Sequence, residues 1–91
     1  MSILERIDRK IRNMSTMLRR FGIDPAAFAQ QRLGVLFTAS MRACQACPNG
    51  DMCRGWLDSA PERIDRVPEF CPNALRFEHA KAVMGDNNAP N

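Results

Sequence analysis

The chain has 91 residues, of which 45% are hydrophobic and 25% charged, with a formal net charge of +3 and no tyrosine. This composition is typical of a globular protein and excludes a disordered or fibrous chain. A domain of this size buries only about 60 to 70 % of the surface of its unfolded chain, so an additional cross-link would help to stabilise it.

Residues 1–14, MSILERIDRKIRNM, carry charges throughout and contain no long apolar run. We therefore expect neither a signal peptide nor a transmembrane segment here, and we predict a protein of the reducing cytoplasm. Stable disulfides are uncommon in that compartment, whereas thiolate ligands of metals and clusters are common.

The first predicted helix begins after Ser2, which forms an S-x-x-E capping box with Glu5, and ends at Gly22. Apolar residues recur in it every three or four positions, which predicts one buried face. These residues are Ile3, Leu4, Ile7, Ile11, Met14, Leu18 and Phe21. The opposite side is basic, and six cations against two acids give residues 1–21 a net charge of +4.

Two more helices are predicted before the cysteines. Asp24 and Pro25 have the character of an N-cap and first residue of a short helix that runs to about residue 33 and stops at Gly34. The next helix is expected from Val35 to about residue 43, with Cys44 at its C-terminal end.

The second half of the chain is predicted to contain shorter elements. Residues 48–52, PNGDM, indicate a turn, and one or two helical turns follow over 52–57. Residues 61–68 are expected to be extended or irregular, and a last helix is predicted over 73–84. The sequence thus predicts an all-α fold with one domain over 1–85, a small bundle of four to five helices with a cysteine-rich loop, and a frayed tail over 86–91.

The four cysteines have the spacing C-x2-C-x5-C-x17-C, at Cys44, Cys47, Cys53 and Cys71. A C-x2-C pair lets two thiolates converge on one centre, and five intervening residues can bring a third to it. The last cysteine would tie the final helix to the loop, so that binding of the centre would also stabilise the fold.

The spacing leaves the identity of the centre open. Structural zinc usually has two close pairs, whereas Cys53 and Cys71 stand apart. Proline follows Cys47 and Cys71, as it follows a cysteine in bacterial ferredoxins. We favour an iron-sulfur cluster, [4Fe-4S], with zinc as the first alternative and disulfides or free thiols as the second.

Two resemblances bear on this choice. The run CQACPNGDMC resembles the last three ligands in the [4Fe-4S] loop of helix-hairpin-helix DNA glycosylases, with the pattern C-x6-C-x2-C-x5-C, but Phe37 stands where their first cysteine would fall. That resemblance would require Cys71 as the fourth ligand, and it implies no base-excision activity because the catalytic pattern is absent.

Over most of its length the chain resembles a family of small four-cysteine bacterial proteins of unknown function. The matching features are an amphipathic N-terminal helix, C-x2-C, a cysteine before Trp56 and Leu57, and a late Cys-x-Asn-Ala that begins at Cys71. This resemblance implies a kinship and no particular activity.

The basic face of the first helix is the candidate partner surface. We assign to it Arg6, Arg9, Lys10, Arg19 and Arg20, and add Trp56 as a possible anchor. The alternative is a solvated face with i,i+4 pairs of Glu5 with Arg9 and Asp8 with Arg12. A protein partner or larger enzyme complex is favoured over nucleic acid, because no aromatic side chain on this face could stack on bases.

Catalysis by the chain alone is the less favoured interpretation. There is one histidine, His79, expected at the surface, and no motif for nucleophilic catalysis or phosphate cradling. The sequence therefore predicts an electron-transfer or redox-sensing accessory module, or a small subunit of a larger enzyme. The competing prediction is a structural interaction protein that is stabilised by zinc or disulfides and docks through the basic amphipathic N-terminal helix. In either case we expect Trp56 and Leu57 to pack over the cysteine centre and keep water out.

Overall fold

The computed structural model describes residues 3–84 of the chain, which form five α-helices, one 3₁₀ turn and no strand. The predicted all-α bundle is therefore confirmed. The helices are α1 (Ile3–Arg20), α2 (Pro25–Gln30), α3 (Val35–Ala46), α4 (Gly50–Ser59) and α5 (Ala74–Met84), with the 3₁₀ turn η1 (Gln31–Gly34) between α2 and α3. None of these helices is long and apolar enough to cross a membrane. The predicted cap at Ser2 and the tail over 86–91 lie outside the described residues.

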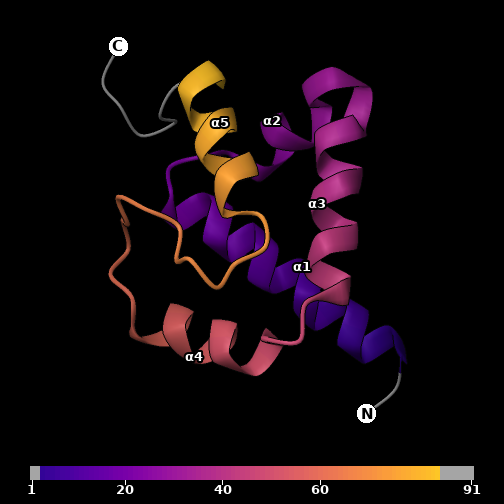
Figure 1. Ribbon diagram of the computed structural model, residues 1–91, viewed down its shortest axis with the longest axis vertical. Helices are drawn as coiled ribbons and strands as arrows, with labels where there is room; N and C mark the ends of the chain where they lie inside the picture. The colour runs from indigo at the N-terminus through magenta and orange to yellow at the C-terminus, as the bar shows by residue number, and fades with distance from the viewer. Residues whose placement is uncertain (1–2, 85–91) are drawn as a thin grey trace.

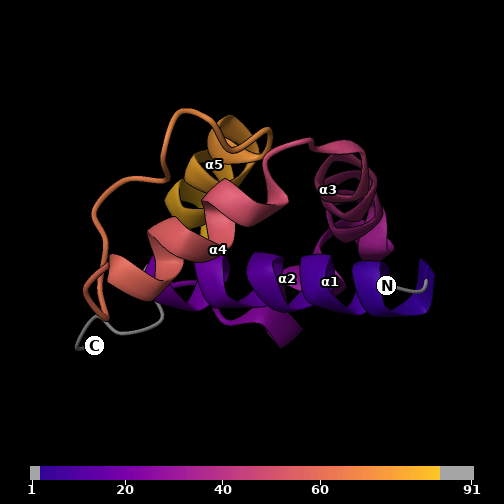
Figure 2. The same cartoon turned by 90° about the horizontal axis from the view of Figure 1, so that it is seen from below.

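Helix α1 is the base on which the other helices pack. Figures 1 and 2 show that α3, α4 and α5 lie on the same side of α1, and α1 contacts α2, α3 and α4 directly. The turn between α3 and α4 and the segment before α5 lie over this side of α1 (Figure 2), and the Asn49 side chain joins them by donating to the Phe70 carbonyl. Cys47 and Cys71 lie on these two segments, and Cys44 and Cys53 lie in the adjoining helices α3 and α4.

The core lies toward the C-terminal half of α1. Met14, Met17, Leu18 and Phe21 follow one another at helical spacing and are at most 3% exposed. The other core residues are Ile23, Phe28, Leu57, Ile64, Val67, Phe77 and Ala80, and the rings of Phe28 and Phe77 meet edge to face at 5.5 Å. The predicted apolar face does not reach the first turn, where Ile3 and Leu4 are 65% and 78% exposed. That turn extends beyond the neighbouring helices (Figure 1), so none of the other helices described here covers it.

Most helix boundaries agree with the predictions, and three differ. The Asp24 carboxylate accepts a hydrogen bond from the Ala27 N–H at 3.3 Å, so the predicted cap of α2 is confirmed. Helix α3 continues to Ala46, which places Cys44 inside its last turn. Helix α4 begins within the predicted turn, at Gly50, because the Cys53 N–H already donates to the Asn49 carbonyl at 2.8 Å.

The third difference is a kink after α2. The predicted helix to residue 33 ends at Gln30, because Arg32 and Leu33 have φ angles of 49° and 56°, in the left-handed region. Gly34 continues this conformation with a φ of 87°. The kink redirects the chain into α3, and it leaves the Leu33 side chain fully exposed.

Candidate functional site

The four cysteines gather around one cavity although they come from three separate segments. Cys44 and Cys47 lie at the C-terminal end of α3, Cys53 lies in α4, and Cys71 precedes α5. All four are half-buried free thiols that line one cavity of about 30 Å³. The structure thus brings the predicted set together, while the group that these residues would hold stays a prediction.

Phe70 is the large apolar side chain in the wall of this cavity, which we call the cysteine cavity, and sequence reasoning missed it. Trp56 contacts Phe70 edge to face, with ring centroids 6.4 Å apart, so it supports the wall from behind. Leu57 was expected to cover the centre, but it is fully buried in the main core and is absent from the wall. The expectation was wrong because Trp56 and Leu57, as neighbours on a helix, point in different directions.

Two of the cysteines begin the same tripeptide, Cys-Pro-Asn, at residues 47–49 and 71–73. The Asn49 N–H donates to Cys47 Sγ at 3.3 Å, and a backbone hydrogen bond of Asn73 opposes the rise in the pKa of Cys71. Proline has no N–H of its own, and in both turns the donor is the residue after it. Each turn therefore offers one backbone hydrogen bond to a sulfur.

The asparagine side chains of the two tripeptides join the cysteine-bearing segments. Asn49 donates to the carbonyl of Phe70 at 3.4 Å and thus links the α3–α4 turn to the segment before α5. Asn73, which is 1% exposed, donates to the carbonyl of Ser40 at 3.0 Å and links the start of α5 to α3. The repetition of Cys-Pro-Asn is the sequence signal that could have identified both asparagines.

Lys10 and Arg20 of α1 bind the C-terminal ends of two other helices. Lys10 Nζ donates to the carbonyls of Gln45 and Cys47 at the end of α3, the latter at 3.1 Å. Arg20 donates to three carbonyls in and just after the last turn of α4, at 2.8 to 3.3 Å; these belong to Leu57, Ala60 and Pro61. Cations stabilise the negative end of a helix dipole. These two predicted partner residues thus have intramolecular roles as well.

Replacing Arg20 with methionine is expected to destabilise the protein by about 2 kcal/mol, because the three carbonyls at the end of α4 lose their charged donor. For a domain of this size the midpoint of thermal unfolding should fall by roughly 10 °C, measured by circular dichroism. Arg19 is the matched control, since it is exposed on the same turn of α1. An Arg19→Met variant should stay within about 0.5 kcal/mol of the parent. Equal losses in the two variants would contradict the assigned role of Arg20.

Burial and mutual repulsion disfavour the charged form of the thiols. Burial, with the nearby Cys71 and Cys47, raises the pKa of Cys44 from its ordinary 9.0 to about 11, against an opposing effect of Lys10. Burial and the other three cysteines raise the pKa of Cys53 to about 11 as well. Burial also raises the pKa of Cys71, while the Asn73 N–H opposes it. A cationic group among the sulfurs would displace their protons.

The spacing of the sulfurs bears on which group fits. No set of three or more His, Cys, Asp or Glu side chains within residues 3–84 is arranged so that it could hold one metal ion. The four cysteines share the lining of one cavity. The donor set is entirely sulfur, which suits iron-sulfur clusters and zinc alike.

The remaining predicted site residues lie outside the cysteine cavity. Arg6 and Arg19 are exposed, and Arg9 forms an ion pair with Asp51 of α4. The predicted pair of Asp8 with Arg12 is present at 2.6 Å. His79 is exposed on α5, as expected.

Comparison with known proteins identifies the family of the chain but identifies no activity for it. Residues 1–83 match the family described as a family of unknown function (DUF6455), so the chain belongs to that family. No curated protein and no solved structure matches it.

Proposed function

We propose that this family member is a small carrier of a cysteine-ligated iron-sulfur centre, [4Fe-4S], held by Cys44, Cys47, Cys53 and Cys71. Its role would be electron transfer or redox sensing as an accessory module or small subunit of a larger enzyme. The observation that carries the proposal is the convergence of all four cysteines of the chain on one cavity with an apolar wall. Four thiolates are the usual ligand set of such a cluster.

One feature favours a cluster over a single zinc ion, namely the resemblance of residues 44–53 to the cluster loop of helix-hairpin-helix DNA glycosylases. The kinship with four-cysteine proteins supports the cysteines as the ligand set without identifying the group.

The residues around the cavity suit a redox centre. When bound, the cluster would supply a site that gains and loses one electron. The backbone N–H groups of Asn49 and Asn73 would stabilise the charge on Cys47 and Cys71, and such hydrogen bonds to sulfur tune the potential. Phe70 would limit access of water. The cysteines are only half-buried, which leaves the centre near the surface where a partner could exchange electrons with it.

The competing function is structural, with zinc or disulfides holding a fold that docks through α1. It is favoured by the hydrogen bonds of Asn49 and Asn73, which join the cysteine-bearing segments to one another and to α3. These bonds indicate that the region around the cysteines contributes to the stability of the fold.

Electron paramagnetic resonance of the anaerobically purified protein separates the two functions. A redox module should change its spectrum on addition of dithionite and recover on mild reoxidation, over repeated cycles and without loss of iron. A structural zinc or disulfide protein would give no reversible signal, and that outcome would reject the redox role even if some metal is bound.

A further inference from the structure

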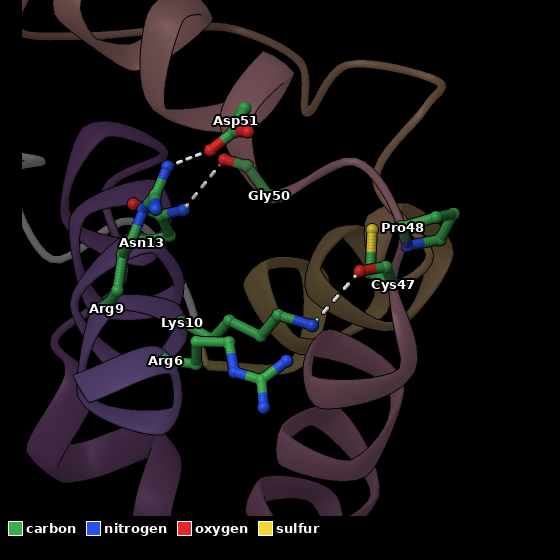
Figure 3. A pocket seen from close by; sticks show the side chains of 8 residues that line it. All are labelled: Arg6, Arg9, Lys10, Asn13, Cys47, Pro48, Gly50 and Asp51. Carbon is green, nitrogen blue, oxygen red and sulfur yellow. Dashed lines mark hydrogen bonds and ion pairs between the residues drawn. The ribbon is translucent and has the colours of Figure 1, made fainter. Parts of the chain in front are cut away.

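A second cavity lies beside the cysteine cavity, between α1 and the turn that joins α3 to α4. Figure 3 shows its walls, with four residues of α1 on one side and four residues of the α3–α4 turn and the start of α4 on the other; these are Arg6, Arg9, Lys10 and Asn13, and Cys47, Pro48, Gly50 and Asp51. Its volume is about 300 Å³, and it is open to solvent. We call it the basic cavity, because three of its side chains are cations and only Asp51 is an anion.

The charges in the basic cavity are only partly compensated. Asp51 pairs with Arg9, and the ammonium group of Lys10 contacts two neutral carbonyls, which leave its charge in place. Arg6 is exposed and takes part in no hydrogen bond or ion pair with another described residue. The three cations and one carboxylate therefore leave an excess of two positive charges around one hollow.

Backbone donors add to this potential. The first intrahelical hydrogen bond of α4 runs from the Cys53 N–H to the Asn49 carbonyl. The N–H groups of residues 50–52 precede this bond and therefore have no acceptor within α4. Gly50 and Asp51 of this first turn line the cavity. The positive end of the α4 dipole thus lies at the same hollow as the three cations.

We propose that the basic cavity binds a phosphate group, free or as a small phosphate monoester. A phosphate monoester carries a charge of about −1.5 to −2 at neutral pH, which matches the excess positive charge of the walls. Arg6 would bind it through its guanidinium fork, and Arg9 and Lys10 would supply further charge. The concave shape favours a small anionic group over an extended acidic surface. This site is additional to the proposed redox function. The proposal of a phosphate site does not depend on which group the cysteines bind.

The basic cavity and the cysteine cavity share a wall. Lys10, Asn13, Cys47 and Gly50 line both. A phosphate bound in the basic cavity would therefore lie next to one of the proposed ligands, with the Lys10 side chain between the two sites.

Calorimetric titration of the whole chain as isolated, with inorganic phosphate at constant low ionic strength, tests the site. Two charge-assisted contacts predict saturable binding of phosphate with a dissociation constant of about 1 mM. An Arg6→Gln variant should bind about tenfold more weakly, while an Arg19→Gln variant should bind within about twofold of the parent. Arg6 makes no contact that folding needs, so both variants should unfold at the parent's temperature.

Glycerol 3-phosphate in the same titration distinguishes the sources of the phosphate. Binding at least as tight as that of inorganic phosphate would support a phosphorylated small molecule as the ligand, and binding of inorganic phosphate alone would support the free ion. Heats no larger than those of sodium chloride at equal ionic strength would overturn the proposal. Equal binding by the parent and the Arg6→Gln variant would overturn it too.

Discussion

Replacement of Cys71 by serine is expected to remove most of the bound centre and to destabilise the loaded protein by about 3 kcal/mol. Structural metal sites with four ligands supply roughly 10–16 kcal/mol of folding free energy, and one ligand accounts for about a quarter of it. Cys71 has an added effect because it is the one cysteine that the segment before α5 contributes, whereas the other three belong to α3, its C-terminal end and α4. The thermal midpoint should fall by roughly 10 to 20 °C.

The centre-free forms provide the control for this variant. Without a bound group, the exchange of a half-buried thiol for a hydroxyl should cost only about 1 kcal/mol. The difference between parent and variant should therefore be large in the loaded proteins and small in the centre-free ones. Equal differences in both states would mean that Cys71 packs in the wall without acting as a ligand.

Replacement of Asn73 by alanine is the second change with a large expected effect. Its side chain is buried, donates to the Ser40 carbonyl on α3 and accepts from Arg76. The loss of these bonds in a buried place should cost about 2 kcal/mol and lower the thermal midpoint by roughly 10 °C. Because Asn73 also orders the turn after Cys71, the variant should lose its centre faster on exposure to a chelator.

Asn49 is the matched control for Asn73, since it occupies the same place in the other Cys-Pro-Asn turn. Its bond to the Phe70 carbonyl is longer, at 3.4 Å, and the residue is only half-buried. An Asn49→Ala variant should lose about 1 kcal/mol by urea unfolding. If it proved as damaging as Asn73→Ala, burial would not be what makes the Asn73 bond important.

The local features of the fold could be predicted from sequence. Periodicity identified α1, the Asp24 cap identified the start of α2, and the irregular 61–68 segment was recognised from its composition. The start of α4 was missed because residues 48–52 are also compatible with a turn. The contacts of Asn13 with the Gly50 carbonyl and of Arg9 with Asp51 hold that first turn against α1. Such long-range contacts have no signature in local spacing.

The candidate site was predictable only in part. Sequence reasoning selected all four cysteines, because thiolates at these spacings point to a shared centre. It did not select Phe70, and it placed Lys10 and Arg20 only on a partner surface. A periodic pattern shows that a cation lies on the polar face of a helix. It does not show that another helix ends within reach of that cation, as α3 does for Lys10.

Iron and acid-labile sulfide analysis of the anaerobically purified protein, together with its visible absorption spectrum, tests the central claim most directly. The proposed centre predicts about four iron and four sulfide per chain with broad cysteinyl-sulfur-to-iron absorption. One zinc per chain without sulfide, or no metal after anaerobic purification, would contradict the claim and leave the structural function in its place.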